Sequence, residues 1–95
     1  GRTVVLWGAG QTGRRLAKLL IDRGVELAAF IDIDPRKIGG TARRCPILAP
    51  EALPGLLGPD VVVLAAVASR GARELIRARL EALGLVEGDG FWCVA

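Results

Sequence analysis

The sequence predicts a single α/β domain with a mostly parallel β-sheet and helices on both faces. Continuous apolar runs alternate along the chain with amphipathic segments, as expected of strands and helices in a layered core. Of the 95 residues, 52% are hydrophobic, and nearly all of these are aliphatic. A chain of this length has room for one such core and not for a second.

The first part of the chain contains a strand, a helix and a second strand. The run at residues 3–7 is apolar and ends at glycine, which is typical of a strand covered on both faces. From Gln11 to Arg23, apolar residues recur at helical spacing while basic residues occupy the opposite face. Gly24 favours a left-handed C-cap that ends this helix. The second strand is predicted at residues 26–31.

The middle of the chain is less regular. A basic, glycine-containing loop at residues 35–44 precedes a short extended piece at residues 45–48, whose Pro46 favours the edge of a sheet. Pro50 then begins a short helix. Because Pro54 lies inside it, we expect this helix to be brief or irregular.

The last part contains a strand, a helix and a final strand. The run at residues 61–66 is the strongest strand of the sequence, and residues 91–95 form the last one. Ser69 is a candidate N-cap for the helix between them, which Gly84 ends. Alternation of this kind implies right-handed crossovers and the strand order 3-2-1-4-5. We therefore predict a Rossmann-type sheet with its switch point between the first and fourth strands.

The turn from the first strand into the first helix contains the motif G-x-G-x-x-G, at Gly8, Gly10 and Gly13. In such a turn the first glycine permits the sharp bend, and the second lets backbone N–H groups approach a pyrophosphate. The third allows close packing of helix and sheet. The helix N-terminus adds N–H donors and the positive end of a dipole. The motif predicts a nucleotide site. The alternative is that the glycines serve only the packing of the strand and the helix, and that the pocket is empty or plugged.

Asp32 follows the second strand at close to the roughly 20-residue spacing that dinucleotide-binding domains show after this motif. Its carboxylate would accept hydrogen bonds from ribose hydroxyls and favour NAD over NADP, whereas Arg36 nearby suits a phosphate. The ligand is predicted to be NAD(H) or a nucleotide sugar. The predicted cofactor-binding residues are Gly8, Ala9, Gly10, Gln11, Thr12, Gly13, Asp32, Ile33, Arg36, Ala66 and Val67.

Further polar residues lie near the same predicted edge of the sheet. Ser69 and Arg70 follow the fourth strand, where a phosphate or a sugar could meet them, although a helix cap is the simpler interpretation of Ser69. The loop after the second strand carries Arg36, Lys37, Arg43 and Arg44. These side chains could hold a ribose phosphate or could simply be solvated.

Composition argues against several other functions. The net charge of +3, without a lysine-rich run, does not indicate a nucleic-acid surface. No apolar stretch approaches the ~20 residues of a membrane span, and no secretory signal opens the sequence. There is no histidine, and Cys45 and Cys93 form no CxxC, so we expect no metal site, no catalytic residue and a cytoplasmic location. The lack of methionine and the immediate first strand lead us to expect a piece of a longer chain.

Four segments together resemble a set of small bacterial Rossmann-like modules: "VVLWGAGQTGRRLAKLL", "AAFIDIDPRKIGG", "CPILAPEAL" and "DVVVLAAVASRGARELI". One such module is the N-terminal domain of sugar acetyltransferases with a left-handed β-helix, in which the matching segments flank a nucleotide-sugar pocket. Others are fused to glycosyltransferases or sugar-modifying methyltransferases. The ending "LGLVEGDGFWCVA" is most similar to the module at the C-terminus of bacterial family 2 glycosyltransferases.

The resemblance implies a non-catalytic accessory domain that binds NAD(H) or a nucleotide sugar for a bacterial glycosyltransferase or related sugar-modifying enzyme. Acetyltransferase modules carry a histidine after the glycine turn, where this chain has Gln11 and Thr12, so acetyl transfer is not expected. One alternative is the cofactor half of an NAD-dependent oxidoreductase or sugar epimerase. Another is a structural or dimerising domain with an empty pocket. The expected partners are a nucleotide-like small molecule, the remainder of the parent chain and a second copy of the domain.

Overall fold

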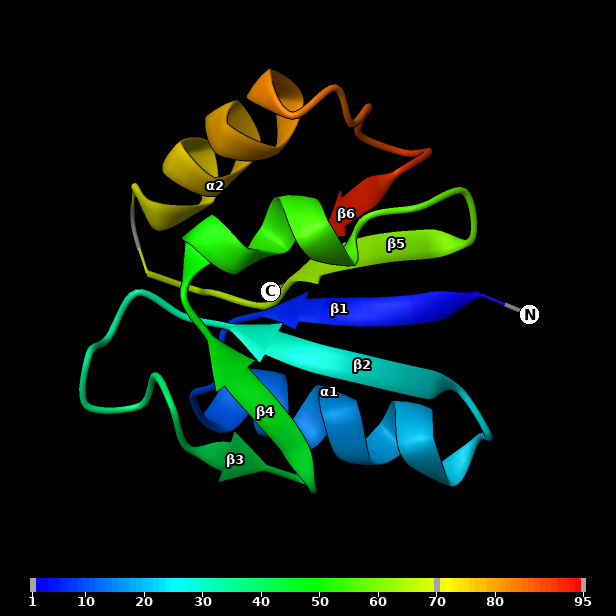
Figure 1. Ribbon diagram of the computed structural model, residues 1–95, viewed down its shortest axis with the longest axis vertical. Helices are drawn as coiled ribbons and strands as arrows, with labels where there is room; N and C mark the ends of the chain where they lie inside the picture. Colours follow the sequence, from blue (N-terminus) through cyan, green and yellow to red (C-terminus); the bar gives the residue numbers. More distant parts are fainter. Residues whose placement is uncertain (1, 70, 95) are drawn as a thin grey trace.

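The computed structural model describes residues 2–69 and 71–94 of the chain. Among these residues, six strands form one sheet in the order β3-β4-β2-β1-β5-β6 (Figure 1). The strands are β1 (Thr3–Trp7), β2 (Glu26–Ile31), β3 (Thr41–Ala42), β4 (Cys45–Leu48), β5 (Val61–Ala65) and β6 (Phe91–Cys93). Neighbouring strands run parallel, except that β3 pairs antiparallel with β4.

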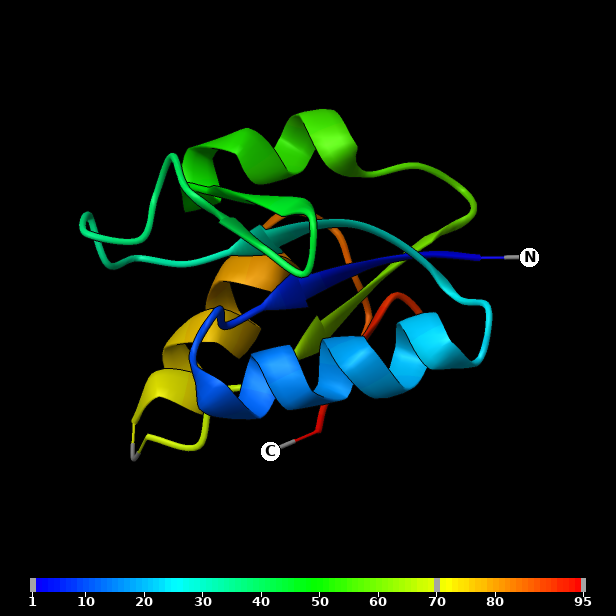
Figure 2. The same cartoon turned by 90° about the horizontal axis from the view of Figure 1, so that it is seen from below.

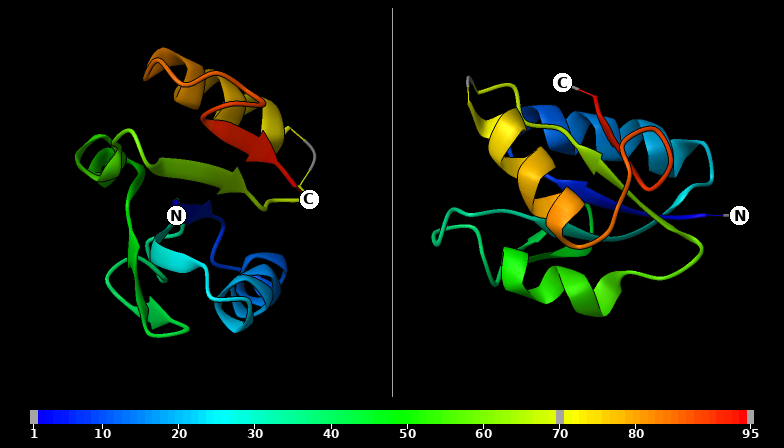
Figure 3. Two further views of the ribbon diagram at one scale, coloured as in Figure 1. Left: turned by 90° about the vertical axis from the view of Figure 1, so that its right-hand side faces the viewer. Right: turned by 90° about the horizontal axis from the view of Figure 1, so that it is seen from above.

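Helices cover both faces of the sheet. They are α1 (Gln11–Asp22), the 3-10 helix η1 (Pro50–Leu56) and α2 (Ala72–Ala82). Figure 2 shows α1 and η1 on opposite sides of the strands, and the left view of Figure 3 separates them again. No helix among the described residues is long and apolar enough to cross a membrane.

The core has two layers because side chains alternate along each strand. On β1, Val5 and Trp7 pack toward η1 and α2, whereas Val4 and Leu6 pack toward α1. The first layer also contains Leu53 of η1 together with Ile76 and Leu80 of α2, and the second contains Ala17 of α1. The central strands are therefore buried on both sides, which explains why they are continuous apolar runs.

The predicted fold class and strand order are confirmed, since the five predicted strands correspond to β1, β2, β4, β5 and β6. Gly24 and Gly84 follow the two long helices with φ of +81° and +89°, the left-handed conformation expected there. The two-residue strand β3 was not predicted. It forms a hairpin with β4 through Arg43 and Arg44, which have φ of 49° and 65°.

The interpretation of Ser69 as the side-chain cap of α2 is wrong. The N-cap is Gly71, which has a φ of +83° and makes no side-chain hydrogen bond to the helix. Ser69 contributes its backbone carbonyl instead, which accepts a 3.2 Å hydrogen bond from the N–H of Ala72. The left-handed glycine inserts a turn before the helix, and the chain reaches helical conformation only at Ala72. Arg70, the other polar residue predicted here, lies outside the described residues.

Candidate functional site

The carboxyl ends of β1, β2 and β5 meet at one edge of the sheet, where a cavity of about 770 Å³ opens. It lies at the switch point, because the chain leaves β1 toward β2 on one side and leaves β5 toward β6 on the other. Its volume falls within the roughly 300–1,000 Å³ of small-molecule sites. Eight of the predicted site residues line it: Gly8, Gly10, Gln11, Thr12, Asp32, Ile33, Ala66 and Val67.

Two of the three glycines of the motif are required by packing. A Cβ on Gly13 would overlap the carbonyl oxygen of Gly8, so the first turn of α1 rests directly against the end of β1. Gly8 has a φ of +120°, and a Cβ there would lie 2.7 Å from the carbonyl oxygen of Ala66. Neither glycine therefore needs a ligand to explain it.

Gly10 is different, because neither packing nor backbone conformation requires a glycine there. Its φ and ψ of −82° and −166° are extended, and any residue can adopt them. The nearest atom to a Cβ on Gly10 would be Nζ of Lys37, at an ordinary contact distance of 3.7 Å. Gly10 lines the cavity as the N-cap of α1 and makes no side-chain cap hydrogen bond. A glycine here keeps the helix N-terminus open to the cavity.

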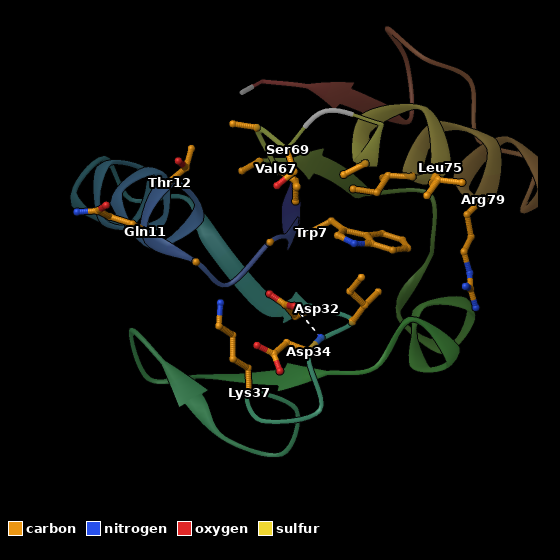
Figure 4. A pocket seen from close by; sticks show the side chains of 17 residues that line it. Trp7, Gln11, Thr12, Asp32, Asp34, Lys37, Val67, Ser69, Leu75 and Arg79 are labelled. Atoms are coloured by element: carbon orange, nitrogen blue, oxygen red, sulfur yellow. Dashed lines mark hydrogen bonds between the residues drawn. The ribbon is translucent and has the colours of Figure 1, made fainter.

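Lys37 brings a positive charge to this opening. Figure 4 shows its side chain rising from the loop after β2 so that the amine points toward the glycine turn. The helix N-terminus supplies backbone N–H donors and the positive end of the helix dipole at the same place. The two features together form a setting that favours a phosphate or diphosphate. Lys37 belongs to the basic loop predicted after the second strand but is not among the site residues predicted from the sequence.

Asp32 links the glycine turn to the loop after β2. Its Oδ2 accepts a 2.9 Å hydrogen bond from the N–H of Ala9, and its Oδ1 accepts one of 2.9 Å from the N–H of Asp34. A carboxylate has about four lone-pair positions, so each oxygen keeps one for a further donor. Because Asp32 lines the cavity, that donor can be a ribose hydroxyl of a bound nucleotide.

Three of the predicted site residues do not line the cavity. Ala9 is buried and its N–H is bonded to Asp32, and Gly13 lies behind Gly8. Arg36 forms a two-point pair with Asp34, with Nε–Oδ1 and Nη2–Oδ2 distances of 3.1 Å, and its side chain is 88% exposed. The Arg36 guanidinium lowers the pKa of Asp34 below its ordinary value. This pairing holds Arg36 outside the cavity.

The other part of the cavity is apolar. Trp7 at the end of β1 and Leu75 of α2 line this part (Figure 4), and Ile33, which follows β2, also lines the cavity. Leu75 and Ile33 are 74% and 73% exposed, so their apolar surface is open to a ligand. Neither Leu75 nor Trp7 is among the site residues predicted from the sequence. The position of Trp7 at the carboxyl end of a central strand was the available signal.

Arg79 closes the cavity on the side of α2. Its Nη2 lies 3.3 Å from Oε2 of Glu51 on η1, so the pair bridges the two helices that cover this face of the sheet. Arg79 is not among the site residues predicted from the sequence. Its place in the lining depends on η1 lying beside α2, which local periodicity does not reveal.

The two cysteines lie away from this cavity. Cys45 donates a hydrogen bond of 3.3 Å from Sγ to the carbonyl of Leu27, and burial raises the pKa of its thiol. Burial also raises the pKa of Cys93, with the negative charge of Glu87 adding to the effect. Raised thiol pKa values disfavour the reactive thiolate. Among the described residues, no cluster of three histidine, cysteine or acidic side chains could hold a metal ion.

Comparison with solved structures assigns the fold. The crystal structure of RSP, a Rex-family repressor, matches 99% of this chain with a TM-score of 0.79 at 19% identity, and RSP has also been solved in complex with β-NADH. The UDP-D-quinovosamine 4-dehydrogenase of Vibrio fischeri matches 86% of this chain and 71% of its own, with a TM-score of 0.70 and 30% identity. The chain belongs to the same family of Rossmann-like domains as this dehydrogenase.

A third similar structure is the acetyltransferase domain of PglB from Neisseria gonorrhoeae FA1090, in complex with acetyl coenzyme A. It matches 90% of this Rossmann-like domain with a TM-score of 0.64 and 26% identity. The domain spans 45% of the RSP chain and 41% of the PglB chain, so it corresponds to one part of each. No protein-family model and no curated protein sequence matches it.

Proposed function

We propose that this Rossmann-like domain binds NAD(H) in the cavity at the switch point, with the diphosphate at Gly10. The observation that carries the proposal is that Gly10 is the one glycine of the motif that packing and backbone conformation leave unexplained. Backbone N–H groups of α1 and the amine of Lys37 would hold the diphosphate. Asp32 would accept hydrogen bonds from a ribose, and the exposed faces of Ile33 and Leu75 would contact a base.

A nucleotide sugar is the second candidate ligand. It is supported by the 30% identity with the V. fischeri structure, whose name specifies a UDP-sugar as substrate. NAD(H) is supported by the RSP complexes with β-NADH and with β-NAD+. Both ligands contain a diphosphate next to a ribose, so the same residues serve either. The apolar part of the cavity near Trp7 and Leu75 would hold the remaining half of the ligand.

We further propose that the domain is a non-catalytic part of a longer bacterial glycosyltransferase or related sugar-modifying enzyme. The resemblance of its sequence to accessory modules of such enzymes supports this role. The cofactor half of an NAD-dependent oxidoreductase or epimerase is the alternative. In the complete protein, a neighbouring domain with a Tyr-x-x-x-Lys pair or a histidine base would favour the oxidoreductase, and a glycosyltransferase domain would favour the accessory role.

Ligand binding is tested by calorimetry with NADH, NAD⁺ and a UDP-sugar. Trp7 lines the cavity and Trp92 packs on the α1 side of the sheet, so a Trp92→Phe background makes fluorescence report on the cavity alone. We expect NADH to quench Trp7 and to bind with the same affinity in both measurements. No heat and no quenching with any of the three ligands at millimolar concentration would overturn the proposal.

The matched variants are Gly10→Asp and Gly55→Asp. The first places a carboxylate where the diphosphate is proposed, yet aspartate is a favourable N-cap, so the fold should be retained. Gly55 lies in η1 outside the cavity lining, and a Cβ there would meet no atom within 4 Å. We expect Gly10→Asp to abolish binding and Gly55→Asp to preserve it. Equal binding by both variants would show that the diphosphate does not lie at Gly10.

A further inference from the structure

A second cavity, of about 480 Å³, lies between the first two turns of α1 and strand β3. It is lined by Gln11, Arg14, Arg15, Thr41, Ala42 and Arg43. We propose that this arginine cavity binds a phosphate group. Gln11 lines both cavities, and Figure 4 shows its side chain directed away from Trp7, toward the outer side of α1.

Two of the three arginines are positioned by hydrogen bonds to the backbone. Nε of Arg14 donates to the carbonyl of Gly10 at 3.3 Å, and Nε of Arg43 donates to the carbonyl of Arg14 at 3.3 Å. Among the described residues, these are the hydrogen bonds that the two guanidinium groups make. Their terminal amino groups therefore remain available. A planar guanidinium with free amino groups suits two-point recognition of a phosphate.

No ion pair neutralises the positive charge of this cavity within the described part of the chain, although the pKa of the Asp22 carboxyl, which Lys18 lowers most, is also lowered by the charge of Arg43. None of Arg14, Arg15 and Arg43 forms an ion pair there, and the lining contains no carboxylate. Asp22, farther along α1, pairs with Lys18 at 2.9 Å. Three guanidinium groups around one cavity repel one another, and a multiply charged anion would remove that repulsion. Phosphate fits the cavity by charge and by hydrogen-bonding capacity.

The hairpin between β3 and β4 holds Arg43 in place at a conformational cost. Arg43 and Arg44 occupy its two central positions with left-handed φ values of 49° and 65°. Asparagine followed by glycine is strongly preferred in a two-residue hairpin of this kind. Arg43 lines the cavity and Arg44 does not, so the turn separates the two neighbouring side chains. Strained residues that persist in a fold are often part of a functional site.

The phosphate can come from two sources. One is free phosphate, and the other is a larger ligand that occupies the cavity at the switch point and reaches across Gln11. The lining arginines are exposed, so binding should be weak and should decrease with salt. The proposal does not rest on nucleotide binding. A Leu75→Ser change in the nucleotide cavity should leave phosphate affinity unchanged, which separates failure of one proposal from failure of the other.

The test is a titration of the ¹⁵N-labelled protein with inorganic phosphate at low ionic strength, with sodium chloride as the ionic control. We expect the Nε signals of Arg14 and Arg43 to shift with phosphate and not with chloride. Arg43→Asn should weaken phosphate binding at least about tenfold, the loss expected for a hydrogen bond to a charged group. Arg44→Asn, which removes the same charge from the same turn, should retain the affinity.

Asparagine tolerates the left-handed conformation, so both hairpin variants should fold. Arg15→Gln on the helix provides a second test that leaves the hairpin unchanged, and it should also weaken binding. Equal effects of Arg43→Asn and Arg44→Asn, or shifts no larger than those with chloride, would overturn the proposal. Competition between inorganic phosphate and NAD⁺ would indicate that the arginine cavity holds the phosphate of a larger ligand. Independent binding of the two would indicate that it holds free phosphate. Both results support the arginine cavity.

Discussion

The backbone N–H of Ala9 donates a 2.9 Å hydrogen bond to Oδ2 of Asp32. This bond joins the glycine turn after β1 to the first residue after β2, and the other carboxylate oxygen accepts the N–H of Asp34. One side chain therefore fixes both loops that border the cavity at the switch point. Asp32 has a structural role even without a ligand.

Asp32→Asn should destabilise the domain. An asparagine side chain has one acceptor oxygen, so one of the two backbone N–H groups would lose its partner and face an amide NH₂. We expect the free energy of unfolding to fall by about 1–2 kcal/mol, measured by urea titration. Asp34→Asn is the control, because that carboxylate pairs with the exposed Arg36. A smaller loss for Asp32→Asn than for Asp34→Asn would contradict the linking role.

Alanine substitutions should separate the three glycines of the motif. Gly13→Ala and Gly8→Ala force a Cβ against backbone carbonyl oxygens and should each lower stability by about 1–3 kcal/mol or more. Gly10→Ala meets no such contact and should change stability by less than about 1 kcal/mol. Guanidinium unfolding of the three variants provides the measurement. A strong destabilisation by Gly10→Ala would remove the argument that this glycine serves a ligand.

The strand order and the position of the glycine turn could be predicted because they follow from repeated local patterns. Buried parallel strands are continuous apolar runs, and the turn residues lie between them at fixed positions. The position of Asp32 after β2 also follows from topology, since parallel strands end at the same edge of the sheet. These features do not depend on the direction of any single side chain in a loop.

The features of the site that could not be predicted depend on the directions of individual side chains. Arg36 and Lys37 are adjacent basic residues, yet Arg36 pairs with Asp34 outside the cavity and Lys37 lines it. Leu75 and Ile76 are both apolar, yet their exposed fractions are 74% and 6%. No Asn-Gly pair marks the β3–β4 hairpin, so the sequence has no ordinary turn signal there.

Leu75→Ser should weaken nucleotide binding without unfolding the domain. The side chain is 74% exposed on α2, so its replacement should change stability by less than about 0.5 kcal/mol. Loss of its apolar contact with a bound base should weaken affinity roughly tenfold by calorimetry. The matched control is Leu19→Ser, a half-exposed leucine of α1 outside the cavity lining. Equal affinities in the two variants would show that Leu75 does not contact the ligand.

Stability should decrease in acid partly through the pair of Arg77 with Glu87, whose Nε–Oε1 distance is 2.8 Å. The hydrogen bond from Arg77 lowers the pKa of Glu87 below its ordinary value. A lowered pKa contributes stability above the unfolded-state value of about 4.3, and this contribution is lost as pH falls through the folded-state pKa. The stability difference between the wild type and Glu87→Gln, measured by urea titration, should therefore be present at pH 7 and shrink below about pH 4.3.

Glu26→Gln serves as the control for this pH dependence, because the exposed Glu26 at the start of β2 forms no ion pair among the described residues. Its stability difference from the wild type should stay small across the same range. A difference for Glu87→Gln that grows as the pH falls would contradict the assigned direction of the pKa shift.

Replacing both central residues of the β3–β4 hairpin should stabilise the domain. Arg43→Asn with Arg44→Gly introduces the pair that this turn prefers and relieves two left-handed non-glycine residues. Because such a conformation costs about 1–2 kcal/mol per residue, and Asn-Gly avoids most of that cost, we expect the free energy of unfolding to rise by about 1 kcal/mol. Urea titration of the double variant measures the gain.

The same variant should lose the proposed phosphate binding, so stability and phosphate affinity should change in opposite directions. A double variant less stable than the wild type would show that Arg43 contributes more to the fold through its bond to Arg14 than the turn costs.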